Sequence, residues 1–198
     1  MKTDYTFKSD EIYLYLIKNL SRKRLLHSIG TAVCARSLAE RHGIDRDKSF
    51  LAALAHDLAR ELPGEELKRL VADEAMELEE DFFARPVLLH GPAAASILKR
   101  NFYIYDQSVL NAVKWHTLGN PAMDEIAKIV YISDYIEITR KHILKEEREE
   151  IFAGELNSSL YRILSKEKKY YKGSSISFTG GKAELYSNLE EMLKYEKS

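Results

Sequence analysis

The chain of 198 residues is 45% hydrophobic and 31% charged, a balance that excludes a disordered or low-complexity protein. Its 30 basic and 31 acidic residues give a net charge of -1, which excludes the strongly basic field typical of nonspecific nucleic-acid binding. The length suffices for one compact domain with its own buried core. We therefore expect a single domain over residues 1–198 and no nucleic-acid partner.

The sequence offers no signal for a membrane or an oxidising compartment. The first residues, from Met1 to Tyr5, contain no apolar secretory segment, and no apolar run approaches the roughly 20 residues that span a bilayer. The single cysteine, Cys34, cannot form an internal disulfide, and we expect it to be a small buried side chain. We expect a cytoplasmic protein without a membrane partner.

Apolar residues recur at three- and four-residue spacings along most of the chain, whereas the alternating runs typical of strands are scarce. This pattern predicts an all-α fold. Capping residues, prolines and glycines then set the expected limits of the helices in the first half. These are Ser9 to Asn19, Ser21 to about His42 before Gly43, a helix from Asp45 that carries His56 and Asp57, a short helix opened by Pro63, and a weak segment around Phe82 and Phe83 that ends at Pro86.

In the second half, His90 precedes Gly91 and Pro92, a pair that favours the start of a helix. We therefore expect His90 at the entrance of a helix that continues through Leu98. The remaining expected helices are Gln107 to about Thr117 after an Asp106 cap, about Met123 to Ile138, Glu146 to about Ser165, and a last helix from a Thr179 cap to Lys194, with a loop over Tyr170 to Phe178.

Histidines and aspartates stand in or beside apolar segments, as His56 and Asp57 do within the run from Leu54 to Ala59. An uncompensated imidazole or carboxylate buried there would cost free energy, and both groups are ligands for transition metals. Adjacent helical residues point about 100° apart, so a single ion held by both would require a helix end or a bidentate compromise. Two ions with Asp57 between them relieve that difficulty. We predict one buried metal site with six candidate ligands: His27, His56, Asp57, His90, His116 and Asp134. His42 and His142 stand beside polar residues, and we expect hydrogen-bonded, partly buried side chains there instead.

The ligand order resembles the HD-domain metal-dependent phosphohydrolases, whose signature is a histidine, a His-Asp pair and a distant aspartate. The two histidines between the pair and the last aspartate resemble the dinuclear branch of that superfamily. The flanking residues are similar to the YqeK-type symmetrical bis(5′-nucleosyl)-tetraphosphatases over roughly Arg22 to Arg140. The matching segments are Arg24 to Ser28, Leu89 to Pro92, His116 to Gly119 and Ser133 to Glu137, with Arg60 standing where that family usually has lysine.

The resemblance implies a helical HD-domain bundle that hydrolyses diadenosine tetraphosphate symmetrically to two ADP, with the metal site at its centre. The motif-bearing core spans about 20–140, and a helical extension follows over about 141–198. The implied cofactor is two divalent or mixed-valence ions, preferably iron, with manganese, cobalt or zinc as alternatives. Asp57 would bridge the ions and position a nucleophilic hydroxide. A guanosine polyphosphate or deoxynucleotide substrate, a non-catalytic nucleotide sensor and a homodimer stay open.

Cutting a four-phosphate chain at its middle requires cations, and Arg24, Arg60 and Arg140 lie near the ligand motifs in sequence. We hypothesise that they bind phosphate, against the alternative of solvated surface side chains. Thr117 could donate its hydroxyl to phosphate or to local backbone. Glu137 could hold a ligand histidine or be a surface carboxylate. Four tyrosines are candidates for stacking a base or forming a dimer face, although packing is expected for most: Tyr103, Tyr105, Tyr131 and Tyr135.

Overall fold

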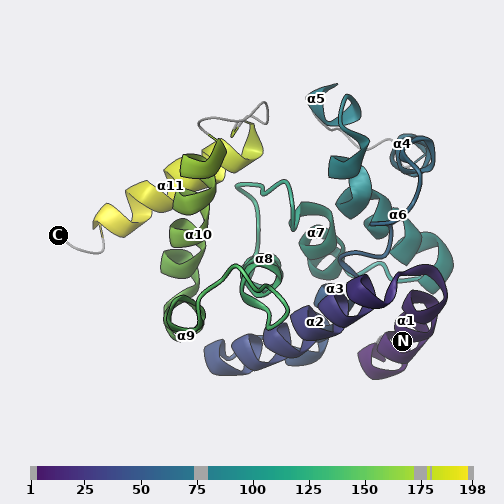
Figure 1. Cartoon of the computed structure of the whole chain (residues 1–198), viewed down its shortest axis with the longest axis horizontal. Coiled ribbons are helices and arrows are strands. Elements are labelled where there is room, and N and C mark those ends of the chain that lie inside the picture. The colour runs from purple at the N-terminus through teal and green to yellow at the C-terminus, as the bar shows by residue number, and fades with distance from the viewer. Residues whose placement is uncertain (1–3, 74–79, 172–177, 179, 196–198) are drawn as a thin grey trace.

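The computed structural model describes residues 4–73, 80–171, 178 and 180–195, and within these ranges it contains helices and no strands (Figure 1). This confirms the all-α prediction. No described helix combines the length and apolar character needed to cross a membrane. The helices are α1 Tyr5–Asn19, α2 Arg22–His42, α3 Arg46–Ala55, α4 Gly64–Ala72, α5 Glu80–Phe83, the 3-10 turn η1 Pro86–Leu89, α6 His90–Phe102, α7 Gln107–Trp115, α8 Glu125–Ile136, α9 Lys145–Ala153, α10 Leu156–Tyr171 and α11 Gly181–Tyr195.

The centre of the bundle is formed by α2, α3, α7 and α8, which pack against one another. In Figure 1, α1, α4, α5 and α6 lie to the right of this centre, and α9, α10 and α11 lie to the left. Leu51, Ile129 and Ile132 are fully buried in the core, and burying a side chain of this size contributes about 1.5–3 kcal/mol. The helix α10 packs on both α8 and α11, so the C-terminal helices are attached to the core through α8.

The first helix begins earlier than the sequence pattern predicts. Asp4 is the N-cap, because its carboxylate accepts hydrogen bonds from the backbone N–H groups of Thr6 and Phe7, both at 3.1 Å. Ser9 lies inside the helix, where its hydroxyl donates to the carbonyl of Tyr5 at 2.7 Å. A serine can bond locally in this way within a helix, so its presence did not mark the start. The expected cap at Ser9 is therefore wrong.

The third helix ends at Ala55, one residue before the His-Asp pair. Asp45 caps its start, as predicted, by accepting from the N–H groups of Asp47 and Lys48. His56 is the C-cap, and Asp57 belongs to the turn that follows. The pair is thus at a helix end rather than within the helix.

The helix that carries Asp134 is shorter than expected at both ends. Asp124 caps its start by accepting from the N–H of Ala127 at 2.9 Å, so Met123 lies outside. Glu137 has extended backbone angles and closes the helix through its N–H bond to the carbonyl of Ser133. Asp134 is helical and Glu137 is the C-cap, and both side chains contact the ring of His27.

The C-terminal region differs most from its prediction. The helix expected from Glu146 to Ser165 is two helices, α9 and α10, separated at Gly154. A side chain at Gly154 would place its Cβ 2.7 Å from Oγ of Ser159. The expected loop from Tyr170 is also wrong at its start, because α10 includes Tyr170 and Tyr171. The predicted cap at Thr179 lies outside the described residues, and α11 ends one residue beyond Lys194.

Candidate metal centre

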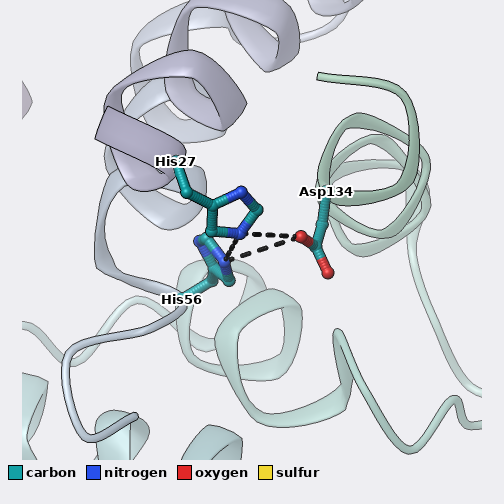
Figure 2. A group of neighbouring side chains, drawn as sticks. All are labelled: His27, His56 and Asp134. Atoms are coloured by element: carbon teal, nitrogen blue, oxygen red, sulfur yellow. Dashed lines mark hydrogen bonds and ion pairs between the residues drawn. The ribbon is translucent and has the colours of Figure 1, made fainter. Parts of the chain in front are cut away.

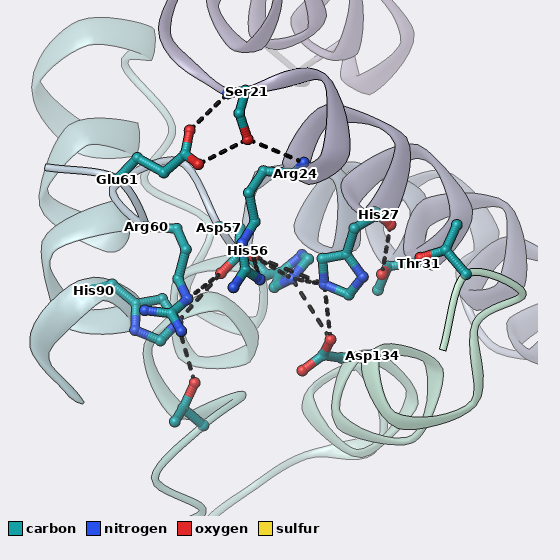
Figure 3. A network of polar contacts seen from close by, with 12 residues as sticks. Ser21, Arg24, His27, Thr31, His56, Asp57, Arg60, Glu61, His90 and Asp134 are labelled. Atoms are coloured by element: carbon teal, nitrogen blue, oxygen red, sulfur yellow. Dashed lines mark hydrogen bonds and ion pairs between the residues drawn. The ribbon is translucent and has the colours of Figure 1, made fainter. Parts of the chain in front are cut away.

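The fold brings all six predicted ligands together in one cluster, in which Asp134 is partly buried and the other five are buried. Figure 3 shows five of them, His27, His56, Asp57, His90 and Asp134. The six residues come from five places in the chain, each a helix or the end of one. His27 lies on α2, His56 and Asp57 at the end of α3, His90 at the first position of α6, His116 at the C-cap of α7, and Asp134 on α8.

One half of the cluster contains His27, His56 and Asp134, whose side chains point toward one another in Figure 2. Nε2 of His27 lies 3.2 Å from Nε2 of His56 and 3.0 Å from Oδ1 of Asp134. Nε2 of His56 lies 3.8 Å from the same carboxylate oxygen. Three potential donor atoms therefore surround one point.

The other half contains His90 and His116, whose Nε2 atoms lie 2.9 Å apart. Asp57 stands between the halves. Its Oδ1 lies 3.3 Å from Nε2 of His90 and 4.0 Å from Nε2 of His116, whereas its Oδ2 lies 3.5 Å from Nε2 of His56 and 3.7 Å from that of His27. Each carboxylate oxygen thus faces one pair of histidines.

The remaining ring nitrogen of each histidine fixes its tautomer. Nδ1 of His56, His90 and His116 lies 2.5–2.7 Å from the backbone carbonyl three residues earlier in the chain. A carbonyl only accepts hydrogen bonds, so each Nδ1 carries the proton and donates, and each Nε2 presents a bare lone pair to the cluster. Two bare nitrogens at 2.9 Å cannot hydrogen-bond to each other. This geometry fits a cation between them.

The Nδ1 atom of His27 is also hydrogen-bonded, but its acceptor is a carboxylate instead of a backbone carbonyl. This Nδ1 donates to Oε1 of Glu137 at 3.0 Å. Burial lowers the pKa of His27, but hydrogen bonds with Asp134 and Glu137 outweigh burial and raise that pKa to about 9. In the protein without an ion, a second proton on His27 supplies the positive charge that the facing carboxylates require. A metal ion would replace that proton.

Electrostatics favour the ligand forms of the other groups. Burial, reinforced by the neighbouring histidines, lowers the pKa of His116 to about 3, which keeps its imidazole neutral. Burial raises the pKa of Asp57, but the surrounding histidines outweigh it and hold the pKa well below its usual range. Neutral imidazoles and ionised carboxylates, with no thiolate among them, form a nitrogen and oxygen donor set suited to iron, manganese, cobalt or zinc.

The three predicted arginines line one cavity of about 470 Å³ that opens over Asp57 and Asp134. Nη1 of Arg24 donates to Oδ2 of Asp57 at 3.2 Å, and Nε of Arg60 lies 3.9 Å from Oδ1 of the same residue (Figure 3). Arg140 donates to both the carbonyl and the carboxylate of Asp134. All three side chains remain partly exposed, so they can contact the centre and a ligand in the cavity at once.

Thr117 and Glu137 both lie beside histidines of the cluster. Oγ1 of Thr117 lies 3.2 Å from Nε2 of His90 and lines the cavity. Glu137 is 1% exposed and is therefore not a surface carboxylate. It accepts from the N–H of Thr139 at 2.6 Å and from the hydroxyl of that residue at 2.5 Å, as well as from His27. These contacts fix the carboxylate that orients His27.

Residues 24–139 match the family model described as HD domain. The chain belongs to the HD domain family. All six clustered residues fall within this HD domain, as do Arg24, Arg60, Thr117 and Glu137, whereas Arg140 lies immediately after it.

Curated relatives extend the similarity. The chain is 34% identical over 143 residues to the symmetrical bis(5′-nucleosyl)-tetraphosphatase of Bacillus subtilis, covering 72% of this chain and 76% of that protein. It is 36% identical to the protein of the same name from Halalkalibacterium halodurans, covering 65% of this chain and 68% of that protein. A crystal structure of a predicted HD superfamily hydrolase involved in NAD metabolism, from Clostridium acetobutylicum, shares 34% identity with a TM-score of 0.83, covering 92% of this chain and 97% of that one.

Part of the cavity wall lies beyond the HD domain and was not predicted from the sequence. Glu167, Tyr170, Tyr171, Lys182 and the exposed His142 also line the cavity. Two neighbouring tyrosines, Tyr170 and Tyr171, could have indicated an aromatic surface, but the loop predicted for this segment gave them no defined position. Of the four tyrosine candidates, residues 131 and 135 line the cavity, whereas residues 103 and 105 are exposed elsewhere.

The expectation of hydrogen-bonded, partly buried side chains is wrong for His142 and holds for the burial of His42. His142 is exposed at the cavity wall. His42 is half-buried, and its buried Nε2 has no hydrogen-bond partner within the described part of the chain. Both histidines have polar neighbours in the sequence, but the polarity of sequence neighbours does not predict which helix packs beside a side chain.

Proposed function

We propose that this HD domain protein is a metal-dependent hydrolase that cleaves diadenosine tetraphosphate symmetrically to two ADP. The observation that carries the proposal is the position of Asp57, whose two carboxylate oxygens each face a pair of histidines. The substrate is proposed from the relatives, since two proteins at 34% and 36% identity are named symmetrical bis(5′-nucleosyl)-tetraphosphatase.

The proposed centre holds two transition-metal ions, preferably iron. His27, His56 and Asp134 would hold one ion, His90 and His116 would hold the other, and Asp57 would bridge them. Two such ions, when bound, supply a nucleophile at neutral pH and neutralise charge on the phosphoryl group. The protein contributes rigid placement, because each histidine is oriented by a second hydrogen bond.

The arginines bind the polyphosphate in this proposal. Arg24, Arg60 and Arg140 come from three separate segments of the chain and line the same cavity, so their guanidinium groups can contact phosphates on different sides of the centre. Their planar donors suit phosphate oxygens, which they would bind by charge-assisted hydrogen bonds. Cleavage at the middle of the chain then follows from holding two phosphates on each side. Thr117 is placed to donate its hydroxyl at the same wall.

Product analysis tests the function directly. The metal-loaded protein is incubated with diadenosine tetraphosphate and with a panel of mononucleotides, and the products are separated by chromatography. The expected products are two ADP per dinucleotide, without ATP or AMP. Formation of ATP with AMP would contradict symmetrical cleavage. Turnover of only guanosine polyphosphates or deoxynucleotides would support a hydrolase with one of those substrates. Stoichiometric metal binding without turnover of any nucleotide would support a non-catalytic nucleotide sensor.

A further inference from the structure

The cavity over the centre continues away from the metal ligands toward the C-terminal helices. A second cavity of about 470 Å³ shares part of its wall, including Tyr135, Glu167 and Tyr171. Its described lining includes none of the six clustered residues and none of the three arginines. The two cavities together therefore have a charged end at the centre and an aromatic end between α8 and α10.

A polar contact among three helices fixes this aromatic end. The hydroxyl of Tyr131 on α8 donates to Oε2 of Glu167 on α10 at 2.7 Å. Nζ of Lys182 on α11 donates to the same oxygen at 2.9 Å and lies 5.4 Å from the ring centroid of Tyr131. Lys182 is mostly buried, with 12% of its side chain exposed. This network attaches the C-terminal helices to the helix that carries Asp134.

Tyr171 presents its ring beside this network. It is half-buried at the end of α10, and Nζ of Lys182 lies 5.9 Å from its ring centroid. The ring of Tyr170 meets it edge-on at a centroid distance of 5.7 Å, while Tyr135 lines the same two cavities. Planar aromatic rings of this kind bind nucleobases by stacking, which depends on the face of the base and little on its identity.

The charges at this end disfavour a phosphate. Both lysines in the cavity walls are already paired with carboxylates, Lys182 with Glu167 at 2.9 Å and Lys166 with Glu147 at 2.5 Å. Within the described part of the chain, Glu167 receives hydrogen bonds from Tyr131 and Lys182 on Oε2, and Oε1 can accept from the amino group of a base. The aromatic end thus offers a neutral, planar ligand both stacking and a hydrogen-bond acceptor.

We infer that α10 and α11 complete the active site by binding a purine base of the nucleotide substrate against Tyr171, beside the network of Tyr131, Glu167 and Lys182. The inference rests on the proposed function for the identity of the nucleotide. It assigns the C-terminal helices, which lie outside the HD domain match, to nucleoside recognition.

Calorimetry with the metal-loaded protein tests the inference, with ADP and inorganic pyrophosphate as probes. Both probes carry the diphosphate, and only ADP carries a base. Tyr171→Ala should weaken ADP binding about tenfold or more, while pyrophosphate binding stays unchanged and reports an intact fold and centre. Tyr171→Phe should keep ADP affinity, because the ring remains. Tyr195→Ala, on α11 and 81% exposed, is the matched control and should bind both probes as the wild type does.

Unchanged ADP affinity in Tyr171→Ala would overturn the inference, as would equal losses for ADP and pyrophosphate, which would indicate a general structural effect. Failure of the proposed function has a different signature. In that case the wild-type protein would bind neither probe, or would bind ADP without cleaving diadenosine tetraphosphate.

Discussion

Gly30 and Glu137 are in direct contact across α2 and the end of α8. A Cβ on Gly30 would lie 2.6 Å from Oε2 of Glu137, closer than real contacts allow. The same carboxylate is held by Thr139 and orients His27 through Nδ1. The absence of a side chain at position 30 therefore gives Glu137 the space that it occupies.

We predict that Gly30→Ala separates metal affinity from stability. An alanine within a helix is about 0.5–1 kcal/mol more favourable than glycine, so the helix itself should not be weakened. The added methyl displaces the Glu137 carboxylate, and loss of such a supporting contact lowers metal affinity about 10- to 100-fold. Metal titration measures the affinity, and thermal unfolding followed by far-UV circular dichroism measures the stability. Wild-type metal affinity in this variant would show that Glu137 does not support His27.

Metal loading should raise the melting temperature. An ion at 100 times its Kd adds about 2.7 kcal/mol, which corresponds to roughly 5–10 °C for a chain of this size. His116→Gln removes a donor atom from the centre and should reduce that increase. His42→Gln changes a histidine outside the cluster and should retain the full increase. Differential scanning calorimetry with and without a chelator makes the comparison, and an equal increase in both variants would argue against ligation by His116.

Arg60→Gln should lower kcat/KM for diadenosine tetraphosphate. A hydrogen bond to a charged group contributes about 1.5–3 kcal/mol, so the loss should be about 10- to 100-fold. Arg36→Gln is the matched control, since Arg36 makes an exposed pair with Asp47 away from the cavity. Steady-state kinetics on the metal-loaded variants gives the result. An Arg60→Gln enzyme with wild-type kcat/KM would remove this residue from phosphate binding.

Asp106 should make the free energy of unfolding depend on pH at a site outside the six-residue cluster. Burial raises its pKa, but hydrogen bonds from Lys48 and Tyr5, at 2.8 and 2.6 Å, and from the backbone outweigh burial and lower it. Because the folded pKa lies below the unfolded value of about 3.9, the stabilisation is present above that value and is lost as pH falls through the folded pKa.

The Asp106→Asn variant should be less stable than the wild type at pH 7 by about 1 kcal/mol, because the amide still caps α7 but replaces the charge-assisted hydrogen bonds from Lys48 and Tyr5 with neutral ones. Urea unfolding at a series of pH values measures this difference, which should shrink as the solution becomes acidic. A difference that stays constant with pH would mean that the charge of Asp106 contributes nothing.

The sequence predicted which polar side chains come together better than it predicted the limits of the helices. His27 and Asp134 are 107 positions apart, yet both were identifiable because a buried polar group in an apolar segment needs a partner. The cap at Asp4 was missed in favour of Ser9, since both residue types cap helices and only packing decides between them. The break at Gly154 was missed because glycine is also tolerated within helices.

The aromatic end of the cavity was beyond prediction for a different reason. Tyr131, Glu167 and Lys182 belong to three helices, and their contact depends on how α10 and α11 pack on α8. The spacing of residues along the chain does not predict how these helices pack. Glu137 was identifiable as a partner of a histidine by its place near Asp134, whereas the need for Gly30 opposite it appears only when α2 and the end of α8 are seen together.

The six clustered residues lie between positions 27 and 134, whereas Tyr171 and Lys182 belong to a later stretch of the chain. Under the assignment proposed above, the clustered donors all precede α10 and α11, whereas the base contacts combine Tyr131 and Tyr135 of α8 with residues of these later helices. Mutations in α10 or α11 would then change how the base is held while the six donors stay in place, so proteins with the same donors could diverge in substrate through their C-terminal helices.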